Sequence, residues 1–117
     1  MYARVTTTQI KLDKLDEAQN MINDYLEPLL KDVTGFKNAL WLIDRKTGKA
    51  LTISVYETEA DMMKLESSEK YLEALDEGAF PAYEIETISK YQEALSKFSK
   101  FFAEPPSRET FQLIKQI

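Results

Sequence analysis

The segment from Phe36 to Glu59 constrains the fold of this chain more than any other. It contains two apolar runs, Phe36–Ile43 and Leu51–Tyr56, joined by the polar stretch Asp-Arg-Lys-Thr-Gly-Lys. A glycine in a short polar loop between two β-rich runs predicts a β-hairpin. Residues 39–43 are apolar without alternation, so both faces of the first strand favour burial. A chain with this hairpin therefore needs cover on both sides of its sheet.

The flanking segments complete a recognisable order of elements. Pro28 falls inside a helical pattern, and we expect it to kink the helix or split off its last turn. The order is β-α-β-β-α-β, which predicts an α+β, ferredoxin-like fold with a four-stranded antiparallel sheet and helices on one face. The predicted elements are a strand over Tyr2–Lys11, a helix over Asp16–Lys31, the hairpin, helical segments beginning at Thr58 and over Glu86–Phe102, and a strand over Thr110–Ile117.

The hairpin loop decides which side chains share a face of the sheet. In one arrangement Gly48 lies in a bulge and Arg45 pairs with Lys49. This register puts Trp41 on the face toward the helices and Tyr56 on the opposite face. A four-residue loop shifts the pairing and puts Trp41 and Tyr56 on the same face. We favour the bulged loop because glycine suits its left-handed position.

The apolar hairpin also predicts a partner. In a ferredoxin-like sheet one face packs on the helices and the other is open. Large apolar side chains left in water there would forfeit roughly 1.5–3 kcal/mol each. We expect a second copy of the chain to cover this face, because a symmetric dimer is the commonest solution. The alternative cover is the C-terminal tail or the extra helical segment of the same chain.

The composition excludes several kinds of chemistry. The chain has no histidine and no cysteine. It therefore has no Ser–His or Cys–His nucleophile pair, no imidazole base and no histidine to ligate haem iron. A Mg²⁺ or Mn²⁺ site made of carboxylates alone stays possible, but no acidic cluster lies on a convincing loop, and we expect no metal and no cofactor. Any catalysis must use tyrosine, tryptophan, asparagine, arginine, lysine or carboxylates, or the reactivity of the substrate.

Length and charge limit the class of protein further. A chain of 117 residues is expected to form a single domain over residues 1–117. Its net charge of −5 argues against a nucleic-acid partner, which needs clustered basic residues. No apolar run approaches the ~20 residues that cross a membrane. With no signal peptide apparent, we expect a cytoplasmic protein.

Five motifs spread over the chain together resemble a known family. They are YARVTT at 2–7, GFK at 35–37, DRKTGKAL at 44–51, ISVYETEAD at 53–61 and AEPP at 103–106. These motifs are similar to those of the antibiotic biosynthesis monooxygenase-like (ABM) domain of the dimeric α+β barrel superfamily. The resemblance covers about residues 1–66 and 91–117, and about 67–90 look like a helical insertion. It implies a homodimer whose two sheets form a barrel, with a pocket between each sheet and its helices.

The resemblance also implies an activity. In the oxygenase members an electron-rich polycyclic phenol reacts with O₂ without metal or flavin, while Tyr, Trp, Asn and Arg side chains bind it and stabilise its anion. This implies a cofactor-independent monooxygenase-like protein acting on a small electron-rich aromatic. No single residue demands catalysis, so the alternative is a non-catalytic, dimeric ligand-binding or stress-associated protein. A third hypothesis is an interaction module that recruits another protein through the extra helical segment.

Four residues are candidates for the substrate pocket. Trp41 could stack on an aromatic ligand or belong to the core. Asn38 could bind a substrate oxygen or face water near the end of its strand. Tyr56 matches the position of a family aromatic, or packs at the dimer interface. Arg4 could neutralise a phenolate, or form a surface ion pair with Glu57.

Overall fold

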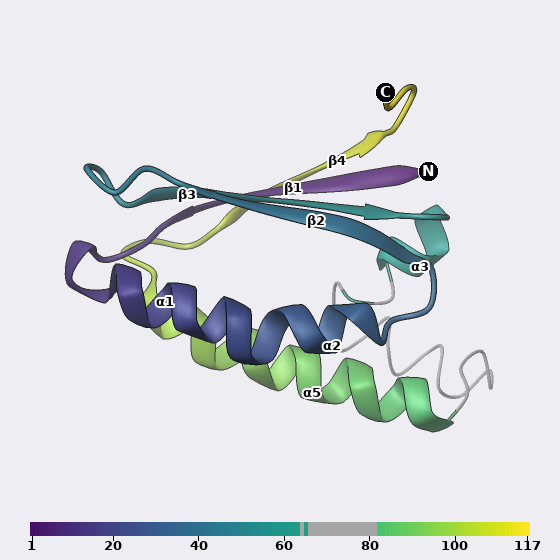
Figure 1. The fold of residues 1–117 in the computed structure, drawn as a ribbon, viewed down its shortest axis with the longest axis horizontal. Helices are drawn as coiled ribbons and strands as arrows, with labels where there is room; N and C mark the ends of the chain where they lie inside the picture. Colours follow the sequence, from purple (N-terminus) through teal and green to yellow (C-terminus); the bar gives the residue numbers. More distant parts are fainter. Residues whose placement is uncertain (64, 66–81) are drawn as a thin grey trace.

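A computed structural model, which describes residues 1–63, 65 and 82–117, shows two layers (Figure 1). A four-stranded antiparallel sheet with strand order β2-β3-β1-β4 forms one layer, and α1, α2 and α5 lie along one face of it. The predicted ferredoxin-like α+β fold is confirmed. Most of the insertion expected at 67–90 lies outside the described residues. The elements are β1 (Tyr2–Gln9), α1 (Leu15–Met21), α2 (Glu27–Lys31), β2 (Phe36–Ile43), β3 (Lys49–Tyr56), α3 (Glu59–Met63), α5 (Ala82–Phe98) and β4 (Ser107–Gln112).

The irregularity expected near Pro28 takes the form of a π-helical turn. This turn, Ile22–Leu26, joins α1 to α2, and the Glu27 N–H bonds back to the carbonyl of Ile22. A proline ring clashes with the carbonyl one turn earlier, and a wider turn gives it room. The two helices therefore run on as one long rod beneath the sheet, as Figure 1 shows.

The hairpin has the four-residue loop, so the bulged register favoured above is wrong. Asp44 N–H donates to Lys49 O at 2.8 Å, and Gly48 N–H donates to Asp44 O at 2.8 Å. Trp41 consequently pairs with Thr52, and Trp41 and Tyr56 fall on the same face. The prediction that Trp41 points toward the helices is confirmed, whereas the prediction that Tyr56 points away from them is wrong.

Gly48 is required for a reason other than a bulge. Its φ is +81°, in the left-handed region, and its carbonyl accepts a hydrogen bond from Ile10 N–H at 2.9 Å. A Cβ atom on Gly48 would collide with the carbonyl of Ile10. The close approach of the loop to the end of β1 therefore explains this glycine.

The last strand begins and ends earlier than predicted. β4 pairs with β1 from Ser107, opposite Thr7, to Gln112, opposite Tyr2. The backbone of Leu113 still donates to Met1 O at 2.8 Å, but β4 ends at Gln112. The predicted bounds of Thr110–Ile117 therefore lie too far along the chain.

The core consists of two clusters of buried side chains. One contains Ile10, Leu15, Ala18, Leu26, Ala50, Ala94 and Phe98, and the other contains Leu30, Val33, Tyr56, Met62, Leu65 and Ile88. The other face of the sheet carries none of the described helices (Figure 1). Its side chains include the exposed Leu40 and Leu42.

Candidate functional site: a cavity between the sheet and the helices

A cavity of about 410 Å³ lies between the sheet and the helices, and residues of both core clusters line it. Its volume falls in the range of roughly 300–1,000 Å³ that is typical of small-molecule sites. From the sheet it is lined by Arg4, Thr6, Thr8, Trp41, Thr52, Ser54, Tyr56 and Arg108, and from α5 by Tyr91, Gln92, Leu95, Ser96 and Phe98.

Small polar residues on the inner face of the sheet leave room for this cavity. Side chains alternate between faces along a strand, so Thr52, Ser54 and Tyr56 of β3 point toward the helices. Leu51 and Ile53 then point to the open face. A packed core would have the opposite arrangement, with the aliphatic side chains inside. This part of the inner face therefore presents polar side chains that a ligand could contact.

Arg4 is a buried cation at this cavity. Its side chain is only 7% exposed, and its Nη2 donates to the carbonyl of Met62 in α3 at 3.1 Å. Thr58, where the sequence predicted a helical segment to begin, caps the start of α3 by accepting from Asp61 N–H at 3.1 Å. The alternative role of Arg4 in a surface ion pair does not fit its burial. A buried guanidinium next to an empty volume provides fixed positive charge for a ligand.

Two tyrosines lie near this charge. Tyr56 is 1% exposed, and burial raises the pKa of its hydroxyl. A hydrogen bond with Ser54 and the charge of Arg4 lower this pKa, but by less than burial raises it. Burial also raises the pKa of Tyr91. Tyr56 raises this pKa further, and the charges of Arg4 and Arg108 lower it. Both hydroxyls keep their protons at neutral pH. They can therefore donate hydrogen bonds to an anion, but they cannot serve as bases.

These raised pKa values predict a pH dependence of stability. As the pH rises past the ordinary tyrosine value of 10.0, the unfolded chain loses the protons of Tyr56 and Tyr91 before the folded chain does. The free energy of unfolding should then fall, by on the order of 1 kcal/mol per pH unit for each group. The substitution Tyr91→Phe removes one group, so urea denaturation between about pH 10 and 11 should give a shallower fall.

The control for this pH dependence is Thr58→Ala. This variant loses a helix cap, which costs about 1 kcal/mol, but retains both tyrosines. Thr58→Ala should be less stable than the wild type, but its free energy of unfolding should fall with pH as steeply as that of the wild type. An unchanged slope in Tyr91→Phe would contradict the assignment of Tyr91 as a neutral buried hydroxyl.

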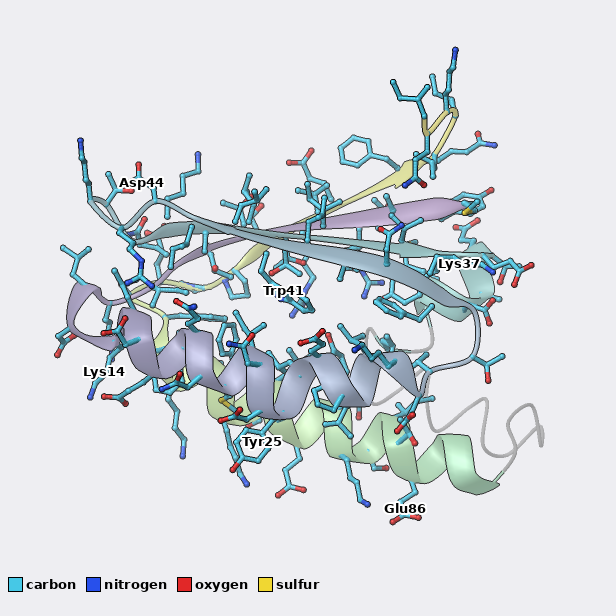
Figure 2. All side chains as sticks on the ribbon, in the orientation of Figure 1. Lys14, Tyr25, Lys37, Trp41, Asp44 and Glu86 are labelled. Atoms are coloured by element: carbon cyan, nitrogen blue, oxygen red, sulfur yellow. The ribbon has the colours of Figure 1, made fainter. Side chains whose placement is uncertain are left out.

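The structure brings three of the four predicted site residues together. Arg4, Trp41 and Tyr56 line the same cavity, and Figure 2 shows Trp41 between the sheet and the helices. Asn38 does not line this cavity. It lines a second hollow of about 360 Å³ at the edge of β2, which Trp41 also lines, and its cross-strand neighbour is Val55 on the open face.

The sequence interpretation missed three residues that line the cavity. Tyr91 and Gln92 lie on the face of α5 that turns toward the sheet, and Arg108 lies on β4. A polar residue such as Gln92 on the inner side of an amphipathic helix is a signal that could have been noticed. Arg108 could not be placed while the last strand was expected to begin at Thr110, because its register with β1 was then unknown.

The described part of the chain shows neither a cluster of metal ligands nor a membrane-spanning helix. Among residues 1–63, 65 and 82–117, no three acidic side chains are grouped as metal ligands would be. Within the same ranges, no helix has the length and apolar character that a membrane span requires.

Comparison with solved structures identifies proteins of the same fold. One is a putative antibiotic biosynthesis monooxygenase from Nitrosomonas europaea, with 13% identity, a TM-score of 0.64, and coverage of 98% of this chain and 100% of that chain. Another is a monooxygenase from Streptomyces coelicolor in complex with nanaomycin D, with 13% identity, a TM-score of 0.66, and coverage of 99% and 89%. A conserved protein from Methanosarcina mazei has 12% identity, a TM-score of 0.65, and coverage of 96% and 92%.

Comparison of sequences gives no match to a family model or to a curated protein. At these identities the structural similarity concerns the fold. It agrees with the resemblance that the sequence motifs predicted. The chain has the fold of the antibiotic biosynthesis monooxygenase-like proteins.

Proposed function

We propose that this protein binds a small electron-rich aromatic in the cavity and oxygenates it with O₂ without a cofactor. The observation that carries the proposal is the convergence of Trp41, two protonated tyrosine hydroxyls and the buried Arg4 on one cavity. An indole offers a flat surface for an aromatic ring. The cation and the hydroxyls provide stabilisation for negative charge on that ring.

The chemistry follows from what these groups can do. Arg4 and the hydroxyls of Tyr56 and Tyr91 favour the phenolate form of a bound phenol, because charge–charge attraction and hydrogen bonding lower its pKa. An electron-rich phenolate such as that of a hydroxyanthrone reduces O₂ directly. The ring methylene becomes a carbonyl that takes one oxygen atom, and the other oxygen leaves as water. The substrate supplies all the electrons, and the protein binds the substrate and stabilises its phenolate form.

The alternative is a ligand-binding protein without chemistry. Neither Tyr56 nor Tyr91 can act as a base, since both keep their protons. The described lining of the cavity also contains no aspartate or glutamate. A site that binds an anion but provides no proton acceptor fits a carrier or a sensor of an already ionised aromatic.

The protein is also proposed to be a homodimer through the open faces of two sheets. Leu40 and Leu42 are 57% and 49% exposed there, and Phe111 of β4 is 50% exposed. Leu40 pairs with Ile53 and Leu42 with Leu51 across the sheet, so the apolar surface is continuous over neighbouring strands. A second sheet laid on this surface would remove it from water.

Oxygen uptake tests the proposed oxygenase. Purified protein given a dihydroxyanthrone should consume O₂ faster than a heat-inactivated sample. The substitution Trp41→Ala should lower the rate about fivefold, because a lost aromatic contact is worth roughly 1 kcal/mol. As a control, Tyr25→Ala removes an aromatic that is 61% exposed and points away from the sheet, and it should keep the rate (Figure 2). A wild-type rate equal to that of the inactivated sample would contradict the oxygenase and favour the ligand-binding alternative.

A further inference from the structure

Two arginines on neighbouring strands share the inner face of the sheet. Arg4 of β1 lies opposite Thr110 of β4, and Arg108 of β4 lies opposite Thr6. Arg4 and Arg108 are therefore diagonal neighbours on one face, at a Cα separation of about 7–8 Å. Both side chains line the cavity. An anion that lies between two such like charges is attracted by both of them.

The charge of the cavity is opposite to that of the whole chain. The net charge of the chain is −5, whereas the described lining contains Arg4 and Arg108 and no acidic residue. Arg108 is exposed at the β4 edge of the sheet and makes no ion pair with an acid among the described residues. Walls of low dielectric concentrate such a charge difference inside the cavity. The cavity therefore attracts anions although the protein surface as a whole repels them.

A third donor lies in the same cavity. Gln92 of α5 lines it, and the Nε2 atom of Gln92 is buried without a hydrogen-bond partner among the described residues. A buried amide donor without an acceptor is unfavourable, and a ligand oxygen at this place would satisfy it. The donor thus points to a ligand with acceptor oxygens rather than to a hydrocarbon.

The register also sets the shape of the ligand. Trp41 pairs with Thr52, Thr52 with Thr6, and Thr6 with Arg108, so these four residues form one row across the sheet. The row spans three strand spacings, or about 14 Å. It has an aromatic surface at one end, a guanidinium at the other and two threonine hydroxyls between them.

We propose that the cavity selects an aromatic carboxylate, with its fused rings against Trp41 and its carboxylate on Arg108 and Gln92. Arginine binds a carboxylate with two parallel hydrogen bonds, which gives both charge and direction. The hydroxyls of Tyr56 and Tyr91 lie at the same cavity and can donate to an oxygen substituent on the rings. This inference rests on the proposed function, because it specifies the ligand of the same cavity.

Calorimetric titration with two non-reacting probes tests the charge preference. The probes are anthraquinone-2-carboxylate and anthraquinone-2-carboxamide, which have the same rings and differ in charge. We expect the carboxylate to bind at least about tenfold more tightly, and added salt to weaken it more than the amide. The substitution Arg108→Gln should lower carboxylate affinity about tenfold and leave amide affinity unchanged.

A matched control and a charge substitution separate the outcomes. Arg45→Gln removes an exposed arginine, paired with Asp16 at 3.1 Å, that lies outside the cavity, and it should leave both affinities unchanged. Gln92→Glu should abolish the preference for the carboxylate through like-charge repulsion. Equal affinities for the two probes, or an equal loss in Arg45→Gln and Arg108→Gln, would overturn the inference and leave the proposed function intact. Binding of neither probe would overturn both.

Discussion

Replacement of Leu42 by glutamate is expected to separate the proposed homodimer into monomers. Leu42 is 49% exposed on the open face of the sheet, opposite the half-buried Leu51. In the proposed dimer both copies place this side chain in the interface, so each interface receives two charges without partners. Sedimentation velocity at micromolar concentration should show twice the 13.5 kDa chain mass for the wild type and the single-chain mass for Leu42→Glu.

The control for this experiment is the adjacent residue. Ile43 is 41% exposed, so Ile43→Glu adds the same charge at similar exposure. It lies on the other side of the strand, near the hairpin loop, where its partner across the sheet is Ala50. This variant should remain dimeric. A monomeric wild type, or equal dissociation of both variants, would contradict an interface formed by the open face.

On β3 the polar side chains face the helices and the aliphatic ones face away, and this alternation connects the proposed interface with the cavity. On β3 the hydroxyl-bearing Thr52 and Ser54 face the helices, and the aliphatic Leu51 and Ile53 face away from them. The cavity and the apolar open face are therefore two consequences of the same alternation. A second sheet over the open face would supply the burial that the inner face lacks.

The order of the elements could be predicted because its signals are local. The β-branched run of β1, the helical spacing of α1–α2 and the glycine-containing loop each depend on a few neighbouring residues. Even the disturbance before Pro28 followed from the missing backbone donor and the bulk of one ring.

The register of the hairpin could not be fixed locally. A three-residue and a four-residue loop both accommodate Gly48 at a positive φ. The contact between Gly48 and the backbone of Ile10, nearly forty residues earlier in the chain, accompanies the four-residue loop. A shift of one residue moved Tyr56 from the expected interface into the cavity.

Three residues of the site could not be predicted from the sequence, because their positions also depend on contacts between distant parts of the chain. Trp41 was identifiable as an aromatic within an apolar strand, and Arg4 as a cation on the first strand. Tyr91 and Gln92 come from α5, and Arg108 comes from β4. Their approach to the cavity depends on how α5 packs beneath the sheet and on where β4 begins, which are both tertiary properties.

The proposed function requires that an aromatic ligand bind next to Trp41. The chain has one tryptophan, so a ¹⁵N-labelled sample gives a single indole N–H signal. The expected change is large, because the ring current of a ligand stacked on the indole acts directly on this proton. The substitution Ser96→Phe places a phenyl group on the α5 side of the cavity and should block the ligand without touching the sheet.

The measurement is a titration of this indole signal with 1,8-dihydroxyanthraquinone, a stable analogue of the proposed substrate. We predict a saturable shift in the wild type and little shift in Ser96→Phe. An indole signal that stays fixed in the wild type while other residues respond would place the ligand elsewhere and contradict the account.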